Sequence, residues 1–273
     1  MKKQQHLLFQ EDFPRSNSYD PGWVLSNQMG PNVLWLAEWL SAALKLEPDR
    51  RVLDLGCGKA LSSVFFAREF GAKVWAVDLW VDPEDNRRRT AEMGFEGRIE
   101  VLQAEAHALP FEDGFFDAVV SLDAYQYFGT DDLYLNYVSR FLKPNGTIGV
   151  VMPGLMRPMP RVPAYLAEPQ SNGTVFWEED CRCFHTLDWW KKHWSGSSLI
   201  KLVLADTLRD GWKRWAEFEE ALEQTGNNRF PTSAEALRKD RGRRLGLIRL
   251  VGTRKEATPR FNFYEPGLLK RIE

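Results

Sequence analysis

The sequence predicts a doubly wound α/β domain built around a mostly parallel sheet. Three observations favour this fold class. Short apolar runs alternate with helical segments along residues 30–152, the runs are apolar at consecutive positions, and the first run ends in a glycine turn that opens a helix. Consecutive apolar positions are typical of strands buried on both faces, and alternation of strands with helices implies parallel crossover units.

Each element of this alternation has its own local signal. Residues 1–29 contain many turn-forming residues and are expected to form an irregular, mobile arm that is a candidate lid. Residues 31–45 are expected to be helical, because Leu34, Ala37 and Leu40 recur at helical spacing. The segments that follow are expected to form strands over 51–55, 74–77, 99–102, 116–121 and 147–152, and helices over 60–70, 83–93 and 131–142, the last capped by Thr130.

The pattern changes after Pro153. Residues 153–185 are rich in proline and show no clear periodicity. Beyond them we expect helices over 186–194, 210–224 and 232–243, and an antiparallel pair of strands over 199–205 and 245–251. The chain therefore divides into an arm, residues 1–29, and one domain, residues 30–273, with insertions at 153–185 and 208–244.

Composition narrows the classes of protein that fit this chain. It has 273 residues, of which 44% are hydrophobic, and this is enough for one large core. Its formal charge of −2 shows none of the basic bias that is typical of nucleic-acid-binding proteins. Three cysteines, an odd number, argue against a disulfide framework. No apolar run is long enough for a signal peptide or a membrane span, so we expect a cytoplasmic protein.

The block from Val52 to Ala60 contains the most informative motif. A buried strand runs into Gly56, Cys57 and Gly58, and a helix begins directly afterwards. Ligands of open α/β sheets bind at such carboxyl ends of strands. The glycines let the backbone bend and approach a ligand closely, and free amides at the helix start can face a carboxylate. We therefore expect these three residues to bind a cofactor.

Two details favour S-adenosylmethionine over a dinucleotide as that cofactor. The dinucleotide fingerprint requires a third glycine where this chain has Leu61. Asp54, directly before the loop, would repel a pyrophosphate but could pair with the α-amino group of S-adenosylmethionine. Asp54 could alternatively cap the helix that follows the loop.

Carboxylates also follow the second and third strands. Asp78, twenty residues after Gly58, could accept both ribose hydroxyls of a nucleoside, and Leu79 beside it is a further candidate contact. Glu105 could accept from an adenine amino group while the amide of Ala106 faces a ring nitrogen. A solvated turn for Asp78 and a structural role for Glu105 are the alternatives.

The fourth strand contributes the last candidates for the cofactor site. Ser121 and Asp123 lie at its end and are expected to face the same cofactor. A purely structural role for both is the alternative.

These motifs, taken in order, resemble those of class I S-adenosylmethionine-dependent methyltransferases. The resemblance is strongest to the small-molecule branch that methylates quinone precursors, sterols and tocopherols, and it covers about residues 30–152. The matching segments are Asp54-x-Gly56-x-Gly58, Asp78, Glu105-Ala106, Leu109-Pro110-Phe111, Phe116 to Val120, and Leu142-Lys143-Pro144-x-Gly146. The resemblance implies a Rossmann-like, seven-stranded, mostly parallel sheet that ends in an antiparallel strand, here with a helical cap insertion near the C-terminus. Two positions depart from the family pattern: Ala60, where the family often has a third glycine, and Glu105, where it more often has aspartate.

Candidate catalytic residues are fewer, because the sulfonium is already an activated electrophile. Tyr125 and Tyr127 could orient an acceptor or could be packed aromatic residues. Related enzymes often carry a histidine near Gln126, and glutamine cannot act as a general base. His185 is a further candidate base, with a structural role before a helix as its alternative.

The region after residue 170 is rich in tryptophan and also contains two cysteines. The tryptophans could line an aromatic pocket for the acceptor, but packing of Trp190, Trp194 and Trp215 against the core is the simpler interpretation. Cys181 and Cys183 do not have the spacing of a known zinc finger, so no metal site is predicted.

The sequence therefore predicts transfer of a methyl group from S-adenosylmethionine to a small-molecule acceptor, without a nucleic-acid or membrane partner. A methyltransferase acting on RNA or protein is the alternative, and a Rossmann protein with another cofactor is a third. The insertions 153–185 and 208–244 are the expected acceptor cap. No oligomeric state is predicted.

Overall fold

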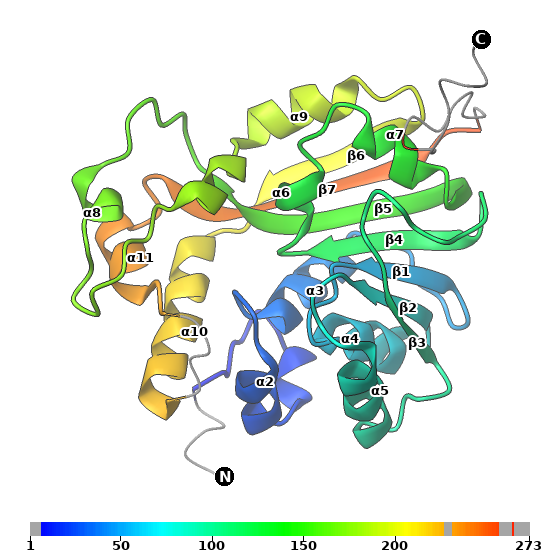
Figure 1. Cartoon of the computed structure of the whole chain (residues 1–273), viewed down its shortest axis with the longest axis horizontal. Coiled ribbons are helices and arrows are strands. Elements are labelled where there is room, and N and C mark those ends of the chain that lie inside the picture. The colour runs from blue at the N-terminus through cyan, green and yellow to red at the C-terminus, as the bar shows by residue number, and fades with distance from the viewer. Residues whose placement is uncertain (1–6, 227–230, 257–263, 265–273) are drawn as a thin grey trace.

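The computed structural model describes residues 7–226, 231–256 and 264, and within these residues one seven-stranded sheet forms the centre of the molecule (Figure 1). The strand order is β3-β2-β1-β4-β5-β7-β6. The strands are β1 (Arg51–Leu55), β2 (Lys73–Asp78), β3 (Ile99–Gln103), β4 (Phe116–Leu122), β5 (Leu142–Leu155), β6 (Ile200–Thr207) and β7 (Leu245–Arg254).

Strand directions follow the predicted scheme. Strands β1 to β5 pair in parallel, and β7 lies antiparallel between β5 and β6. Ile148 pairs with Gly252 in the middle of the β5–β7 ladder. The doubly wound fold and the terminal antiparallel pair are therefore confirmed, as is the insertion between the last two strands.

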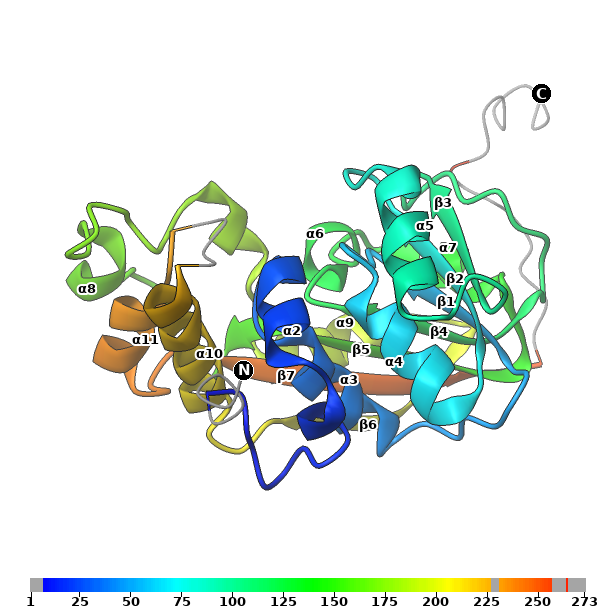
Figure 2. The ribbon, with the colours of Figure 1, turned by 90° about the horizontal axis from the view of Figure 1, so that it is seen from below.

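Helices cover both faces of this sheet, as Figures 1 and 2 show. Helices α3, α4 and α5 pack on one face, while α6, α7 and α9 pack on the other. Each face has its own cluster of buried apolar side chains. The helices are α2 (Pro21–Asn27), α3 (Val33–Ser41), α4 (Leu61–Phe70), α5 (Pro83–Glu92), α6 (Tyr125–Phe128), α7 (Tyr134–Ser139), α8 (Ala164–Ala167), α9 (Leu187–Ser195), α10 (Gly211–Thr225) and α11 (Ala234–Asp240), with 3₁₀ turns η1 (Ser16–Ser18) and η2 (Glu179–Cys183).

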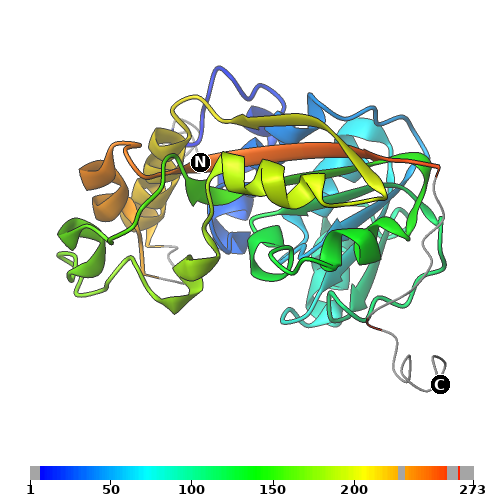
Figure 3. The same ribbon diagram turned by 90° about the horizontal axis from the view of Figure 1, so that it is seen from above.

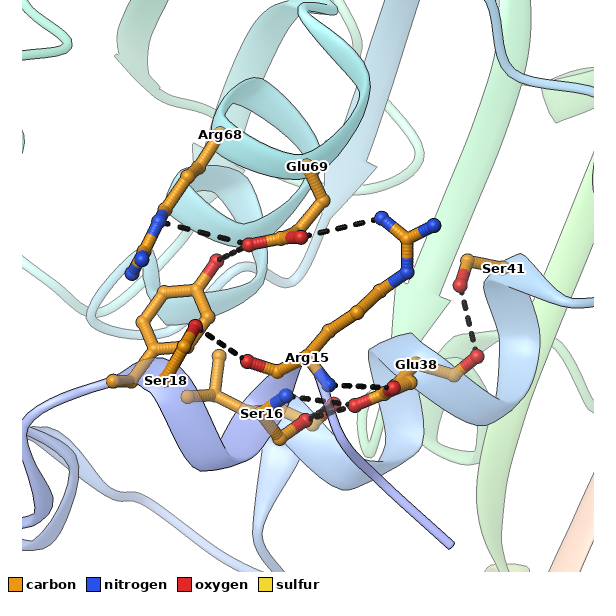
Figure 4. A network of polar contacts seen from close by, with 9 residues as sticks. Arg15, Ser16, Ser18, Glu38, Ser41, Arg68 and Glu69 are labelled. Atoms are coloured by element: carbon orange, nitrogen blue, oxygen red, sulfur yellow. Dashed lines mark hydrogen bonds and ion pairs between the residues drawn. The ribbon is translucent and has the colours of Figure 1, made fainter.

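The arm at residues 1–29 differs from its predicted irregular form over the residues that the structure describes. Asp20 caps α2 by accepting from the amide of Trp23 at 2.8 Å, and Pro21 occupies the first turn of the helix. The backbone amides of Arg15 and Ser16 donate to Glu38 of α3 at 2.9 and 2.8 Å (Figure 4). The Asp-Pro-Gly run therefore begins a helix instead of forming an isolated turn, and the segment is anchored to α3.

The predicted helix over 131–142 is shorter in the structure, where only α7 occupies this range and the separate helix α6 precedes it. Gly129 ends α6 by packing on the ring of Tyr125, where an added Cβ would lie 2.1 Å from a ring carbon. Asp131 then accepts from the amide of Leu133 at 2.8 Å, so this polar turn delays the next helix until Tyr134. Thr130 makes no cap, and β5 begins at Leu142, inside the segment predicted to be helical.

Helices α8, α10 and α11 form a lobe beside the carboxyl ends of β4 and β5, which Figure 3 shows from above. The lobe has a third apolar cluster, in which Trp215 of α10 packs with Leu237 of α11 and Leu245 of β7. Leu155, at the end of β5, packs against it. The two predicted insertions therefore meet in one lobe. No helix among the described residues is long and apolar enough to cross a bilayer.

Candidate cofactor and acceptor site

The glycine loop after β1 is held against the end of β2. The amides of Gly56 and Cys57 both donate to the carbonyl oxygen of Val77, at 2.8 and 3.0 Å. Gly56 has φ +72°, and a Cβ there would lie 2.4 Å from the Cβ of Ala124. The loop therefore requires glycine for conformation and for space. The amides of Gly56 and Cys57 are therefore used within the fold, whereas the free amides expected from the sequence are those at the start of α4.

Asp78 fixes the other side of this loop. Its Oδ2 accepts from the amide of Gly58 at 2.8 Å, and its Oδ1 accepts from the amides of Trp80 and Val81 at 2.8 and 3.0 Å. A carboxylate offers about four lone-pair sites, so one more donor can still be accommodated. Asp78 thus holds the glycine loop in place and also remains a hydrogen-bond acceptor at the tip of β2.

Asp54 is fully buried, and only one of its two carboxylate oxygens has a hydrogen-bond partner. The hydroxyls of Ser62 and Ser63, in the first turn of α4, both donate to its Oδ2 at 2.6 Å. Its Oδ1 is buried without a hydrogen-bond partner. Burial raises the pKa of this carboxyl to about 6, against the effect of the two serines. Sequence reasoning missed these serines, although polar residues at consecutive positions of a buried helix were a usable signal.

Beyond β3, Glu105 folds back on its own turn. Its side chain accepts from the amide of His107 at 2.8 Å and lies 2.7 Å from the ring Nδ1 of that residue. The carbonyl oxygen of Ala106 accepts from the hydroxyl of Tyr134 at 3.2 Å. The ring of His107 lies 4.9 Å from both Tyr134 and Tyr264. This arrangement orders the turn that was predicted to meet adenine.

An exposed apolar surface stands next to Asp78. Leu79 is 48% exposed and Trp80 is 76% exposed, and the carbonyl oxygen of Leu79 accepts from Gln103 at 2.9 Å. Large exposed apolar side chains beside a polar site are typical of a surface that binds a flat ligand. Leu79 was predicted as a contact, whereas Trp80 was not.

The two candidates at the end of β4 differ in their surroundings. Ser121 is buried and donates to the carbonyl oxygen of Leu55 at 2.7 Å, so it ties β4 to β1. Asp123 has a left-handed backbone, with φ +57°, and its carboxylate lies against Gly30. Burial raises the pKa of Asp123 to about 7.

The two candidate catalytic tyrosines differ in their exposure to solvent. Tyr125 is buried, with its ring 5.8 Å from those of Trp190 and Trp194, and its hydroxyl has no access to an acceptor. This burial favours the alternative interpretation of Tyr125 as a packed aromatic residue, and packing of these two tryptophans against the core is confirmed. Tyr127 is 49% exposed, and burial together with Asp123 raises the pKa of its hydroxyl.

His185 belongs to a stack of rings on α9. Its ring lies 3.7 Å from that of Trp189 at an angle of 14°, and His193 stacks on Trp189 at 4.7 Å. Burial lowers the pKa of His185. The nearby thiols of Cys181 and Cys183 donate to the carbonyl oxygens of Phe176 and Asp180, at 3.4 and 2.8 Å. In the described part of the chain, no three potential ligands are grouped for a metal ion.

Comparison with known proteins agrees with this geometry. Residues 52–146 match the family described as methyltransferase domain, which is about a third of the chain. A glycine/sarcosine/dimethylglycine N-methyltransferase of Actinopolyspora halophila is 33% identical over 110 residues, which are 40% of this chain and 20% of that protein. A demethylmenaquinone methyltransferase of Thermus thermophilus is 34% identical over 136 residues, 48% of this chain and 60% of that protein. The match thus spans a fifth to three fifths of these relatives.

Solved structures share the whole fold. A putative sarcosine dimethylglycine methyltransferase from Galdieria sulphuraria has a TM-score of 0.63 and 17% identity, covering 91% of this chain and 92% of that one. Geranyl diphosphate C-methyltransferase from Streptomyces coelicolor A3(2) has a TM-score of 0.61 and 18% identity, covering 82% and 77%. The predicted resemblance to S-adenosylmethionine-dependent methyltransferases of small molecules is confirmed.

Proposed function

We propose that this chain, whose residues 52–146 are a methyltransferase domain, transfers the methyl group of S-adenosylmethionine to a small-molecule acceptor. The observation that carries the proposal is the bond from the Gly58 amide to Asp78, which joins the glycine loop to the tip of β2. Ligands of open α/β sheets bind where such tips meet.

The residues present fit the three parts of this cofactor. The buried, unpartnered Oδ1 of Asp54 lies beside the glycine loop and suits a donor such as the α-amino group. Asp78 has room for a ribose hydroxyl. The exposed side chain of Leu79 and the ordered turn at Glu105 and Ala106 suit the adenine ring. When bound, S-adenosylmethionine supplies a methyl group on a positively charged sulfur.

The protein then has to orient the acceptor in line with the bond between sulfur and methyl and to exclude water. Orientation of this kind can supply about 7–11 kcal/mol of the barrier, so a strong acid or base is not required. Residues 153–185 and 208–244 contribute the lobe at the carboxyl ends of β4 and β5. We assign the acceptor side to this lobe and to Asp123 and Tyr127.

A small-molecule acceptor is favoured over RNA or protein. The relatives named above are named for sarcosine or a quinone as substrate, and the formal charge of −2 shows no overall basic bias of the kind typical of nucleic-acid-binding proteins. All three cysteines are free thiols, which supports a reducing, cytoplasmic location.

Calorimetric titration of the full chain with S-adenosylmethionine, S-adenosylhomocysteine and NAD tests the proposal. We expect both sulfur nucleosides to bind at one site per chain and NAD to show no saturable binding. A folded chain that binds neither sulfur nucleoside, or that prefers NAD, would refute the assignment.

A further inference from the structure

An acidic group of side chains surrounds the end of β4. Asp123 follows that strand, Tyr127 lies on α6, Asp180 and Cys183 belong to η2, and Glu219 lies on α10. Burial raises the pKa values of Asp123, Tyr127 and Cys183, and nearby carboxylates raise them further: Glu219 acts on Asp123, while Asp123 and Asp180 act on Tyr127 and Cys183. Among the described residues, no Arg, Lys or His contributes to these shifts. The described residues therefore place carboxyl groups near one another here without a resident cation.

Asp123 has no ion-pair partner in the part of the chain that the structure describes. Its single side-chain hydrogen bond is a long one, 3.4 Å from Gln126 Nε2 to Oδ1. Its backbone is held at φ +57° by the bond from its amide to the carbonyl oxygen of Val151 at 2.8 Å. Gly30 makes this placement possible, because a Cβ there would lie 1.9 Å from Asp123 Oδ2.

Gln126 supplies an independent observation. Its side chain is fully buried, and its Nε2 donates to the backbone oxygen of Asp123 at 3.1 Å. Its Oε1 is buried and has no hydrogen-bond partner. Buried polar atoms are nearly always paired in folded proteins, so an unpaired carbonyl beside a carboxylate that accepts only one long hydrogen bond indicates a missing donor.

We propose that the methyl acceptor is an amine, bound with its nitrogen between the Asp123 carboxylate and Gln126 Oε1, with the ring of Tyr127 beside it. An ammonium group has several N–H donors and a positive charge, so it can satisfy both oxygens and offset the acidic surroundings. A hydroxyl has one donor and no charge, and a carboxylate substrate would be repelled. The exposed ring of Tyr127 suits a nitrogen that carries methyl groups.

The methyl transfer then balances as follows. The bound ammonium passes one proton to the Asp123 carboxylate, which becomes the neutral acid. The nitrogen lone pair forms the new bond to the methyl carbon, and the electron pair of the breaking carbon–sulfur bond stays on sulfur. The product is a methylated ammonium and S-adenosylhomocysteine, and Asp123 releases its proton to solvent. Asp123 is a catalytic residue in this scheme, and Gln126 is an acceptor that orients the nitrogen.

Matched pairs of probes test this inference, which rests on the proposed function. The full chain, saturated with S-adenosylhomocysteine, is titrated with N-methylethanolamine and N-methylbenzylamine, and with the isosteric ethers 2-methoxyethanol and benzyl methyl ether. Methylation is followed separately by mass spectrometry with deuteromethyl-labelled S-adenosylmethionine. We expect at least one amine to bind, with at least tenfold preference over its ether, and to be methylated.

Variants test whether amine binding depends on Asp123 and Tyr127. Asp123→Asn should weaken amine binding at least tenfold, leave ether binding unchanged and leave the affinity for S-adenosylhomocysteine within about twofold. Asp188→Asn, which removes a 92% exposed carboxylate on α9, is the charge-matched control and should change nothing. Tyr127→Phe should retain amine binding, because the ring remains, whereas Tyr127→Ala should weaken it.

The outcomes separate the two proposals. A folded wild-type chain that does not bind S-adenosylhomocysteine would refute the proposed function itself. Normal cofactor binding combined with no amine binding, with equal affinity for amine and ether, or with an unaffected Asp123→Asn variant would overturn only the amine inference. Loss of cofactor affinity in Asp123→Asn would overturn it as well, because Asp123 would then belong to the cofactor side.

Discussion

Replacing Asp78 by alanine takes away the acceptor for three backbone amides at once. The amide of Gly58 would lose its partner at 2.8 Å, and those of Trp80 and Val81 would lose theirs at 2.8 and 3.0 Å. These bonds hold the glycine loop against the tip of β2. The substitution should therefore affect both cofactor affinity and stability.

The two effects can be given separate magnitudes. A charge-assisted bond from a ribose hydroxyl contributes about 1.5–3 kcal/mol, which corresponds to a loss of roughly 10- to 150-fold in affinity. The three amides lie at a partly exposed turn, where water can replace the carboxylate, so we expect a stability cost of about 1–3 kcal/mol. For a chain of this size, each kcal/mol lowers Tm by about 2–4 °C.

The assay combines calorimetric titration of S-adenosylhomocysteine with thermal unfolding, carried out on Asp78→Ala, Asp78→Asn and wild type. Asp85→Asn, which removes an exposed carboxylate on α5, is the control and should match wild type in affinity. We expect Asp78→Asn to be intermediate, because its amide oxygen can still accept on one side. Unchanged affinity in a folded Asp78→Ala variant would show that the carboxylate is not at the nucleoside.

Three further predictions concern positions whose environment the structure defines. Gly56→Ala should destabilise the chain by about 1–3 kcal/mol in denaturant unfolding, because φ is +72° and the new methyl would meet Ala124; a cost below about 0.5 kcal/mol would contradict the loop geometry. The pKa of Glu219 is raised by burial to about 7, so the folded state binds the extra proton and stability should fall as pH rises from about 4.5 to 7. Glu219→Gln should lack this fall in urea unfolding series, and parallel pH profiles of the two proteins would count against a buried carboxyl. Tyr125→Phe should keep methyl transfer within about twofold in a turnover assay, because its hydroxyl is buried away from any acceptor; a tenfold loss would restore its catalytic role.

Local sequence signals were sufficient for the sheet and for the positions of the cofactor candidates. β1 coincides with the predicted strand, because its apolar run is bounded by a charged residue and by Gly56. Helix α9 lies where a helix over 186–194 was predicted, and Thr186 caps it by accepting from the amide of Trp189 at 3.2 Å. These features depend on neighbours within a few residues, and a single sequence contains that information.

Features that depend on tertiary contacts could not be predicted from the sequence in the same way. The break between α6 and α7 arises because Gly129 packs on Tyr125. The two oxygens of Asp54 differ because the hydroxyls of Ser62 and Ser63 approach only one of them, and no pattern around Asp54 itself specifies this. The proximity of α10 to the end of β4 joins segments about a hundred residues apart, and no local pattern specifies it.

A crystal structure of the full chain with S-adenosylhomocysteine tests the central claim most directly. We predict that the amino-acid end of this nucleoside lies along Gly56 to Gly58, that its ribose hydroxyls meet Asp78, and that its sulfur faces Asp123. A nucleoside bound at another surface, or a ribose out of reach of Asp78, would contradict the account.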